Sequence, residues 1–340
     1  MPEGSRTSRP TLEAVAAHAG VSRATVSRVV NGDAGVRPSM REQVLRSVEE
    51  LGYVPNHAAR SLVTRRHDAV AVVIGEPETK VFGDPYFSRA LRGISRELSA
   101  ADQQLVLLLV EDENDYRRVG RYLAGGHVDG ALLFSLHRDD PLPAQARAAR
   151  LPAVLGSSPW DPEPGTLYVD SDNHAGAAAA TRHLTRTLRR RVVGTVTGPS
   201  DIIAGVDRLR GFREVCPKAD DDLIEEGDFT AWGGERATLA LLERRPDVDG
   251  LFVASDLMAS GALAALRRCG RRVPEDVAVV GFDDIDEIAP VADPPLTTVR
   301  QEIEGLGRSM ARLLLRLVAE GPEGLEPVVQ PTRLVLRGSA

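Results

Sequence analysis

Short apolar runs that alternate with helix-like stretches dominate the chain from about residue 68 onward and most constrain its fold. The first run, residues 70–74, is apolar at every position, as in a strand buried on both faces. The candidate strands are residues 70–74, 105–110, 130–134, 153–155, 192–197, 251–254 and 277–281. This βαβ rhythm predicts a doubly wound parallel sheet. A weak internal similarity between GHVDGALLFS (126–135) and PDVDGLFVAS (246–255) favours two similar halves.

The first 66 residues differ from the rest in charge. They carry ten arginines against six acidic residues, whereas the remainder carries 32 basic and 43 acidic residues. A small basic head on an acidic body indicates that only the head meets a polyanion.

Helical spacing predicts three short helices in this head, over residues 11–19, 22–30 and 37–51. The first is expected to start at an N-cap, Thr11, and to end at Gly20. The residues expected on the inner face of the third helix are Val44, Leu45, Val48 and Leu51.

Two short helices separated by a glycine-containing break predict a helix-turn-helix, whose second helix enters the DNA major groove. The second helix contains SRATVSR, at residues 22–28. Hydroxyl groups and arginines contact bases and phosphates, and small side chains let the backbone come close. The residues expected to face outward are Ser22, Arg23, Ala24, Thr25, Ser27 and Arg28, with Val26, Val29 and Val30 facing the core. The alternative is an ordinary three-helix surface on which serine and threonine are merely solvated.

The head resembles that of the LacI family of bacterial transcription regulators. The resemblance lies in TLEAVAAHAGVSRATVSRVVNG (11–32) and ELGYVPN (50–56), with Val36, Arg41 and Val44 between them. It implies that Arg23 and Ala24 read variable operator bases. It further implies DNA-anchoring or helix-capping roles for Thr25, Ser27, Arg28 and Asn31, and DNA contacts for Thr11, Ser22, Tyr53 and Asn56.

NHAARSLVTRR (56–66) looks like the hinge helix of the same family, which folds only on operator DNA and beside its dimer partner. By this resemblance Leu62 wedges into the minor groove at a central pyrimidine–purine step. Ala58 and Ala59 would allow close approach to the groove. Such a wedge kinks the duplex and gains contact in return. The alternative is a flexible linker with Leu62 buried in the body.

From about residue 68 to 337 the chain resembles the family's effector domain, which is shared with periplasmic sugar-binding proteins. This implies an all-α head followed by a body of two α/β subdomains, with a ligand between them at the carboxyl ends of the strands. The expected organisation is a disordered tail (1–10), a helix-turn-helix domain (11–55), a hinge helix or linker (56–67) and an effector-binding and dimerisation domain (68–340).

Candidate effector residues lie where strands end or where the family's cleft motifs match. They are Glu76, Tyr86, Phe87, Arg208, Phe229, Trp232, Ser255, Asp256, Asp283 and Gln301. Aspartate and arginine pair with vicinal sugar hydroxyls, and aromatic rings stack on the CH faces of a sugar.

Several of these residues also have structural alternatives. Asp256, like Asp284, can cap a helix. Arg208 can form a structural ion pair, and Tyr86 and Phe87 can pack in the core. The segment DSDN (170–173) favours a capping role over ligand binding.

Within the family, EPETKVFGDPYFS, GHVDGALLFSLHRDDPLP and EGDFT look most like repressors of cellobiose, cello-oligosaccharide or β-glucoside utilisation. Two positions depart from the pattern. Ala204 stands where many sugar-binding members carry a hydroxylated residue, and Ser255 where many carry asparagine. Another sugar or a non-sugar metabolite therefore remains the alternative effector.

Several other classes of function are disfavoured. Cys216 and Cys269 form no CxxC, the seven histidines are scattered, and no GxSxG or Walker A motif occurs. We therefore expect no enzyme activity, no metal and no cofactor. No 18-residue apolar run or hydrophobic leader occurs, so we expect a cytoplasmic protein without a membrane partner. The resemblance implies a homodimer on a near-palindromic operator, and the tail LRGSA (336–340) lacks heptads for a coiled coil.

The hinge resemblance generates a prediction. Leu62→Ala removes the expected wedge, so operator affinity in a gel-shift titration should fall strongly while effector binding is unchanged. Unchanged operator affinity would refute the wedge.

Overall fold

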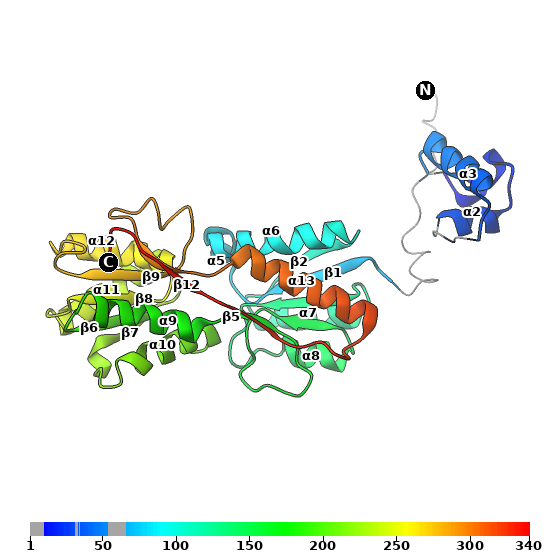
Figure 1. Ribbon diagram of the computed structural model, residues 1–340. Helices are drawn as coiled ribbons and strands as arrows, with labels where there is room; N and C mark the ends of the chain where they lie inside the picture. The colour runs from blue at the N-terminus through cyan, green and yellow to red at the C-terminus, as the bar shows by residue number, and fades with distance from the viewer. Residues whose placement is uncertain (1–9, 31–32, 34, 54–65) are drawn as a thin grey trace, which may run out of the picture. The chain divides into compact units, whose positions relative to one another are not determined.

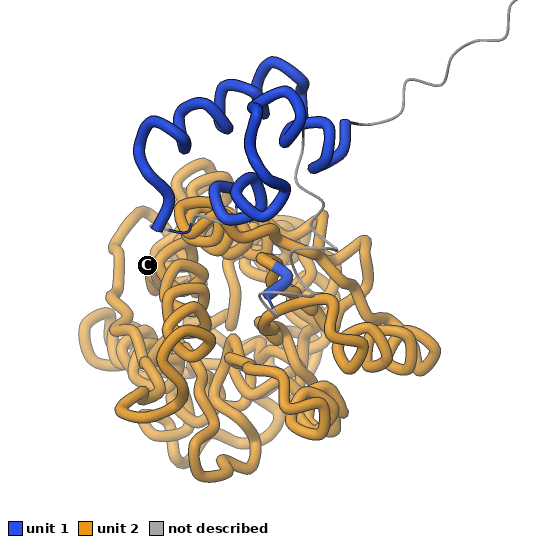
Figure 2. Tube along the Cα trace, turned by 90° about the vertical axis from the view of Figure 1, so that its right-hand side faces the viewer, with its two compact units in different colours: residues 1–67 blue, residues 68–340 orange. Residues whose placement is uncertain are grey.

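The computed structural model describes residues 10–30, 33, 35–53 and 66–340. The chain divides into two compact units, Met1–His67 and Asp68–Ala340 (Figure 2). Asn31, Asn56, Ala59 and Leu62, together with most of the expected tail and hinge, lie outside the described residues.

The head consists of the helices α1 (Leu12–His18), α2 (Arg23–Val30) and α3 (Pro38–Leu51). Thr11 caps α1 by accepting a hydrogen bond from the Ala14 amide. Gly20 turns the chain at a φ of 60°, a conformation that glycine adopts at little cost. Val15, Val26 and Val44 are fully buried and form the centre of the head's core.

One prediction for α3 is wrong, because Leu45 is 49% exposed. Buried Ser47 lies on the inner face instead, beside Val44, Val48 and Leu51. Positions 44, 47, 48 and 51 follow the helical repeat and share one face, which residue 45 does not.

The N-terminal subdomain of the body is a parallel sheet of order β2-β1-β3-β4. Its strands are β1 (Ala69–Ile74), β2 (Gln104–Leu109), β3 (Gly130–Phe134) and β4 (Ala153–Leu155). Its helices are α5 (Glu78–Gly83), α6 (Pro85–Ala100), α7 (Glu113–Ala124), α8 (Leu142–Ala148) and α13 (Ile303–Glu320). One apolar core lies between the sheet and α6 with α13, and another between the sheet and α7 with α8. Every residue of β1 is buried, as its apolar run predicts.

The C-terminal subdomain has a sheet of order β12-β10-β9-β8-β6-β7, parallel except for β12. Its strands are β6 (Val193–Thr197), β7 (Ile224–Glu226), β8 (Gly250–Val253), β9 (Ala278–Asp283), β10 (Thr297–Arg300) and β12 (Arg333–Val335). Its helical elements are α9 (Asn173–Arg182), η1 (His183–Thr187), α10 (Ile203–Val215), η2 (Asp221–Leu223), α11 (Ala231–Arg244) and α12 (Asp256–Arg268). The helices α9 and α10 cover one face of the sheet, and α11 and α12 cover the other.

The chain passes between the two subdomains after β5 (Val169–Ser171), after β10 and after β11 (Val328–Gln330) (Figure 1). The strands β5 and β11 pair in parallel, so two of these crossings run side by side. The helix α13, late in the sequence, thereby packs in the N-terminal subdomain. Several neighbouring connections allow the subdomains to change their relative angle without separating.

All seven candidate strands of the body are present, and the predicted two-subdomain α/β fold is confirmed. The strands that prediction missed are β5, β7, β10, β11 and β12. They have at most four residues each and carry polar side chains, as in Ile224–Glu226 of β7, so they lack the apolar run.

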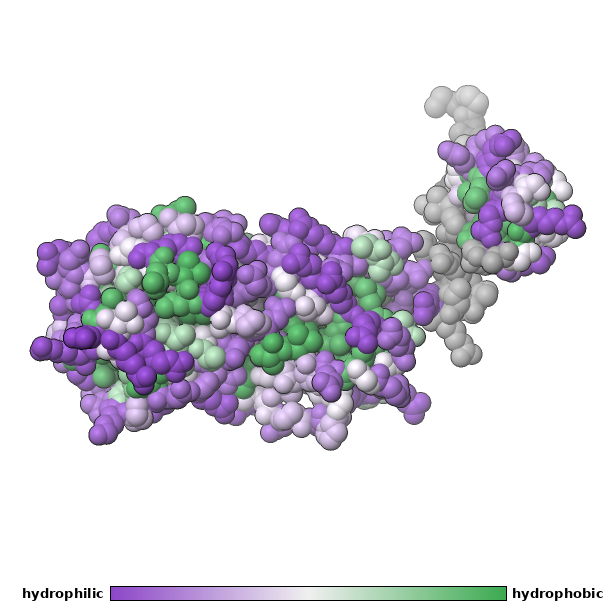
Figure 3. Space-filling model, in the orientation of Figure 1, coloured by the Kyte–Doolittle hydropathy of each residue, from purple (hydrophilic) through white to green (hydrophobic). Residues whose placement is uncertain are grey.

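On the face drawn in Figure 3, hydrophilic residues form the rims of the body and apolar residues gather in one area on each subdomain. No helix among the described residues is both long and apolar enough to cross a bilayer. Within the same residues, no group of three or more His, Cys, Asp or Glu side chains is arranged to hold a metal ion.

The core of the C-terminal subdomain gives a stability prediction. Leu184 lies on η1, is fully buried and belongs to the apolar core that η1 and α9 form with the sheet. Leu184→Ala should lower the free energy of unfolding by about 2–5 kcal/mol, because it leaves a cavity. Leu336 is 61% exposed, so the control Leu336→Ala should change it by less than about 0.5 kcal/mol. Equal values for the two variants in urea unfolding would contradict this packing.

Candidate functional site

The outer face of the head is formed by the first turns of α2. Ser22, Arg23, Ala24 and Arg28 are exposed, whereas Val26 and Val29 are buried beneath them. These six residues follow the split that the sequence predicts for a recognition helix, whereas Thr25, Ser27 and Val30 are half-buried.

Some of these polar side chains also stabilise the head itself. Ser22 Oγ accepts the Thr25 amide at 3.2 Å, and the two hydroxyl oxygens lie 2.9 Å apart. This is an N-cap, which helps to fix where α2 begins. Arg23 Nε lies 3.0 Å from Glu13 Oε1 on the surface, and Tyr53, 8% exposed, packs in the head's core.

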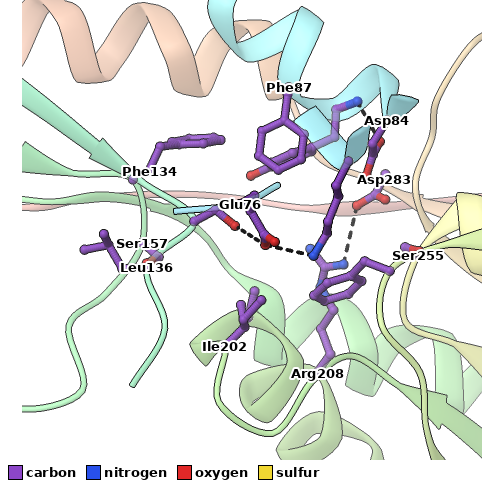
Figure 4. A pocket seen from close by; sticks show the side chains of 16 residues that line it. Glu76, Asp84, Phe87, Phe134, Leu136, Ser157, Ile202, Arg208, Ser255 and Asp283 are labelled. Atoms are coloured by element: carbon purple, nitrogen blue, oxygen red, sulfur yellow. Dashed lines mark hydrogen bonds and ion pairs between the residues drawn. The ribbon is translucent and has the colours of Figure 1, made fainter. Parts of the chain in front are cut away.

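A cavity lies between the two subdomains of the body, at the carboxyl ends of their central strands (Figure 4). This is the usual place for a ligand in open α/β sheets. Seven of the ten predicted effector residues line it: Glu76, Tyr86, Phe87, Arg208, Phe229, Ser255 and Asp283. The lining residues that prediction left out are Lys80, Asp84, Phe134, Ser135, Leu136, Gly156, Ser157, Ile202 and Ala204.

Arg208, on α10, is the buried cation of the C-terminal side. Its Nε donates to Asn173 Oδ1 at 2.9 Å and its Nη1 to the Ala254 carbonyl at 2.5 Å. Its Nη1 also lies 3.4 Å from Asp283 Oδ1. The guanidinium carbon lies 3.8 Å from the centre of the Phe282 ring, a cation–π contact. Arg208 therefore both forms a structural ion pair and lines the cavity.

Asp283 ends β9 at a φ of 118°, a backbone conformation uncommon outside glycine. Its Oδ1 accepts from Gln301 Nε2 at 2.6 Å. Burial raises the pKa of Asp283 to about 7, although nearby Arg208 opposes the shift. Asp284, the next residue, does not line the cavity. Its carboxylate pairs instead with Arg300 and Arg337.

On the N-terminal side, Glu76 follows β1 and is buried. Its Oε1 accepts from Lys80 Nζ and from Ser135 Oγ, each at 2.8 Å. Asp84 caps α6 through the Tyr86 amide at 2.9 Å, and burial raises the pKa of its carboxyl group.

An aromatic cluster closes this side of the cavity. The rings of Tyr86 and Phe134 stack with centroids 5.7 Å apart, and Phe87 meets Tyr86 edge to face at 5.6 Å. Phe229 lines the cavity from the other subdomain, and Lys80 Nζ lies 5.7 Å from the centre of its ring. Tyr86 and Phe87 therefore pack against the apolar core and line the cavity at the same time.

Three predicted effector residues do not line the cavity. Gln301 is buried and does not line the cavity, but it holds Asp283 through its side-chain amide and its backbone amide. Asp256 is fully buried and accepts from Thr298 Oγ1 at 2.5 Å and from the Ile285 amide at 2.8 Å, which ties α12 to β10. Trp232 is 68% exposed on α11, with Arg236 over its ring.

Some of the missed residues carried a usable signal. Ser135 directly follows β3, and Gly156 and Ser157 directly follow β4, so the strand-exit rule that identified Glu76 also applies to them. Lys80 lies four residues after Glu76 on a short helix and had no such signal.

The arrangement suits a polyhydroxylated ligand. Carboxylates of Glu76, Asp84 and Asp283 accept hydrogen bonds, Lys80 and Arg208 donate them, and aromatic rings supply flat apolar faces. A small-molecule cavity between two hinged subdomains, in a chain that also carries a helix-turn-helix head, defines a ligand-responsive DNA-binding regulator.

Comparison with known proteins agrees with this class. Residues 11–56 match the model of bacterial regulatory proteins of the LacI family, and residues 181–340 match a periplasmic binding protein-like domain. The transcriptional regulator CelR of Thermobifida fusca is 50% identical over 98% of this chain and 99% of its own. The ribose operon repressor of Halalkalibacterium halodurans is 32% identical over 96% of each chain.

Two solved structures are also similar. A CelR–cellobiose complex has a TM-score of 0.77 and 48% identity, covering 98% of this chain and 100% of that chain. A lac repressor dimer bound to operator and the anti-inducer ONPF has a TM-score of 0.84 and 26% identity, covering 98% and 99%. The chain belongs to the LacI family of bacterial transcription regulators and is a DNA-binding regulator rather than an enzyme.

The raised pKa of Asp283 generates a pH prediction. The folded body retains this proton up to about pH 7, whereas the ordinary carboxyl pKa is 3.8, so between these values the folded state binds more protons than the unfolded state. The contribution of Asp283 therefore makes the free energy of unfolding fall as the pH rises through this window.

Asp283→Asn should flatten this pH dependence in urea titrations between about pH 4 and about pH 7. Asp221, whose side chain is 92% exposed, provides the matched control Asp221→Asn, which should leave the slope unchanged. An unaltered slope in Asp283→Asn would contradict the assignment.

Proposed function

We propose that the chain is a sequence-specific repressor of sugar-utilisation genes, whose operator affinity is controlled by cellobiose or a related β-glucoside bound in the cavity between its subdomains. The observation that carries this proposal is the lining of the cavity, with buried carboxylates, Arg208 and aromatic rings converging on one space. The similarity to CelR, solved as a cellobiose complex, supports the choice of sugar.

The charge of the cavity favours a neutral ligand. Glu76 pairs with Lys80 and Asp283 lies beside Arg208, so the charges that face the cavity are nearly balanced. An anionic metabolite would have to compete with these pairs in a partly dehydrated space. Another sugar or a non-sugar metabolite is the remaining alternative.

The head is proposed to bind DNA through α2, with Arg23 and Ala24 reading operator bases and the neighbouring residues fixing the helix on the backbone. The exposure of Arg23, Ala24 and Arg28 over buried valines supports this orientation. The other proposed DNA-binding residues are Thr11, Ser22, Thr25, Ser27, Asn31, Tyr53, Asn56, Ala59 and Leu62. For Ser22 and Thr25 we propose a double role, because they also cap α2.

The proposed working form is a homodimer on a near-palindromic operator, in which the two-fold axis of the DNA site matches that of the protein. The similarity to a lac repressor dimer on operator DNA supports it. We also propose the division into tail (1–10), DNA-binding domain (11–55), hinge (56–67) and effector domain (68–340), and a cytoplasmic location, where the chromosome is accessible.

The proposed switch is a change in the angle between subdomains. Residues from both subdomains line the cavity, so a ligand that contacts both favours one closure state. If the dimer's hinge segments follow this angle, effector and operator affinities are coupled, and each ligand alters the binding of the other.

Thermal-shift and gel-shift measurements test the proposal together. Cellobiose at about one hundred times its dissociation constant should stabilise the folded protein by about 2.7 kcal/mol and raise its melting temperature. It should also change the affinity for DNA from upstream of the neighbouring genes. Maltose, the α-linked isomer, is the matched ligand control and should have a smaller effect. If no β-glucoside raises the melting temperature, the sugar assignment falls.

The aromatic contact supplies a variant for the same assay. Phe229→Ala removes a ring from the cavity wall and should weaken cellobiose binding by roughly two- to tenfold. Operator affinity without sugar should be retained, since Phe229 lies in the body. Unchanged cellobiose affinity would place the sugar elsewhere.

A further inference from the structure

A second cavity adjoins the effector cavity in the N-terminal subdomain. It is bounded by the segment after β3, by α8 and by the loop that follows β4. We refer to it as the annex. None of the ten effector residues predicted from the sequence lines it.

The annex and the effector cavity share two lining residues, Leu136 and Ser157. In Figure 4 both lie at the end of the effector cavity away from Ser255 and Asp283. These two side chains therefore stand where the two cavities meet. A ligand too long for the effector cavity would extend past Ser157 toward the annex.

The wall of the annex contains a stack of two planar groups. The guanidinium carbon of Arg138 lies 3.8 Å from the centre of the Trp160 ring. Trp160 Nε1 is buried and has no hydrogen-bond acceptor among the described residues. A buried donor of this kind is ordinarily satisfied, so it calls for an acceptor such as a ligand hydroxyl.

The charges around the annex are largely compensated. Arg147 Nη1 lies 2.8 Å from Glu163 Oε2, and His137 Nδ1 lies 2.7 Å from Asp201 Oδ2. No strong field of one sign therefore selects an ion, and the mixture of polar and apolar side chains in the lining favours a neutral, hydroxyl-rich ligand. The His137–Asp201 contact also joins the two subdomains, so a ligand in the annex lies beside a contact that closes the cleft.

We propose that the annex is a second carbohydrate subsite, which holds sugar units beyond those in the effector cavity, so that the effector is a cello-oligosaccharide chain. The inference rests on the proposed function, because it extends the same ligand. Trp160 and Arg138 form the specificity-determining wall of this subsite, and Ser157 lies where the chain passes between the cavities.

Titration calorimetry with cellobiose and with cellotetraose, on the full-length protein, tests the proposal. The wild-type protein should bind cellotetraose more tightly than cellobiose. Trp160→Ala should weaken cellotetraose binding by roughly fivefold to tenfold and leave cellobiose binding unchanged. The chain's other tryptophan, Trp232, is 68% exposed and lines neither cavity, so Trp232→Ala is the matched control.

A second variant guards against a fold defect in Trp160→Ala. Ala144 lies on the exposed surface of α8 and lines the annex, so Ala144→Trp fills the annex without altering a buried position. It should reduce cellotetraose affinity to the level of cellobiose. In Trp232→Phe, Trp160 is the only indole, and its emission should change with cellotetraose but not with cellobiose.

The outcomes separate the two proposals. Binding of cellobiose with no added affinity for cellotetraose, or equal losses for both sugars in Trp160→Ala, would overturn the annex alone. Absence of binding by either sugar to the wild-type protein would overturn both the annex and the sugar effector. Selective loss of cellotetraose in Trp160→Ala and Ala144→Trp, with Trp232→Ala unchanged, would support both.

Discussion

The buried guanidinium of Arg208 holds together the side of the cavity that the C-terminal subdomain supplies. It joins α9 through Asn173, the end of β8 through the Ala254 carbonyl and the end of β9 through Asp283. A buried cation is tolerated only when it is paired and hydrogen-bonded, so each partner must keep its position. The same contacts leave one edge of the guanidinium lining the cavity, and stability and recognition therefore depend on one side chain.

The division of the body into two subdomains gives this cavity its regulatory use. Glu76 and the aromatic cluster come from one subdomain, and Arg208, Phe229 and Asp283 come from the other. The chain crosses between them beside the paired strands β5 and β11. A ligand that contacts both sides therefore acts on the angle between two bodies that already share several connections.

Much of the fold and part of the site could be predicted, for identifiable reasons. The apolar runs predict the central strands, because a strand buried on both faces needs apolar residues throughout, as in Ala69–Ile74. The strand-exit rule located Glu76, Ser255 and Asp283. It did not distinguish Asp256, which is near the same edge but buried beneath it in hydrogen bonds to Thr298 and Ile285. The direction in which a side chain points at a strand end depends on tertiary packing, and the spacing of residues along the chain does not encode this packing.

The amino-acid sequence by itself determined the kind of protein, because the helix-turn-helix pattern, the βαβ rhythm and the LacI-type motifs are local and dense. Tertiary structure alone decided which residues share the cavity. Lys80 joins Glu76 there, Trp232 lies outside, and the annex brings Arg138 against Trp160. Arg138 follows β3 and Trp160 follows β4, so their proximity comes from how these strands and α8 pack in space. Lys80 stands four residues after Glu76, a spacing that brings the two together but does not reveal that both line the cavity.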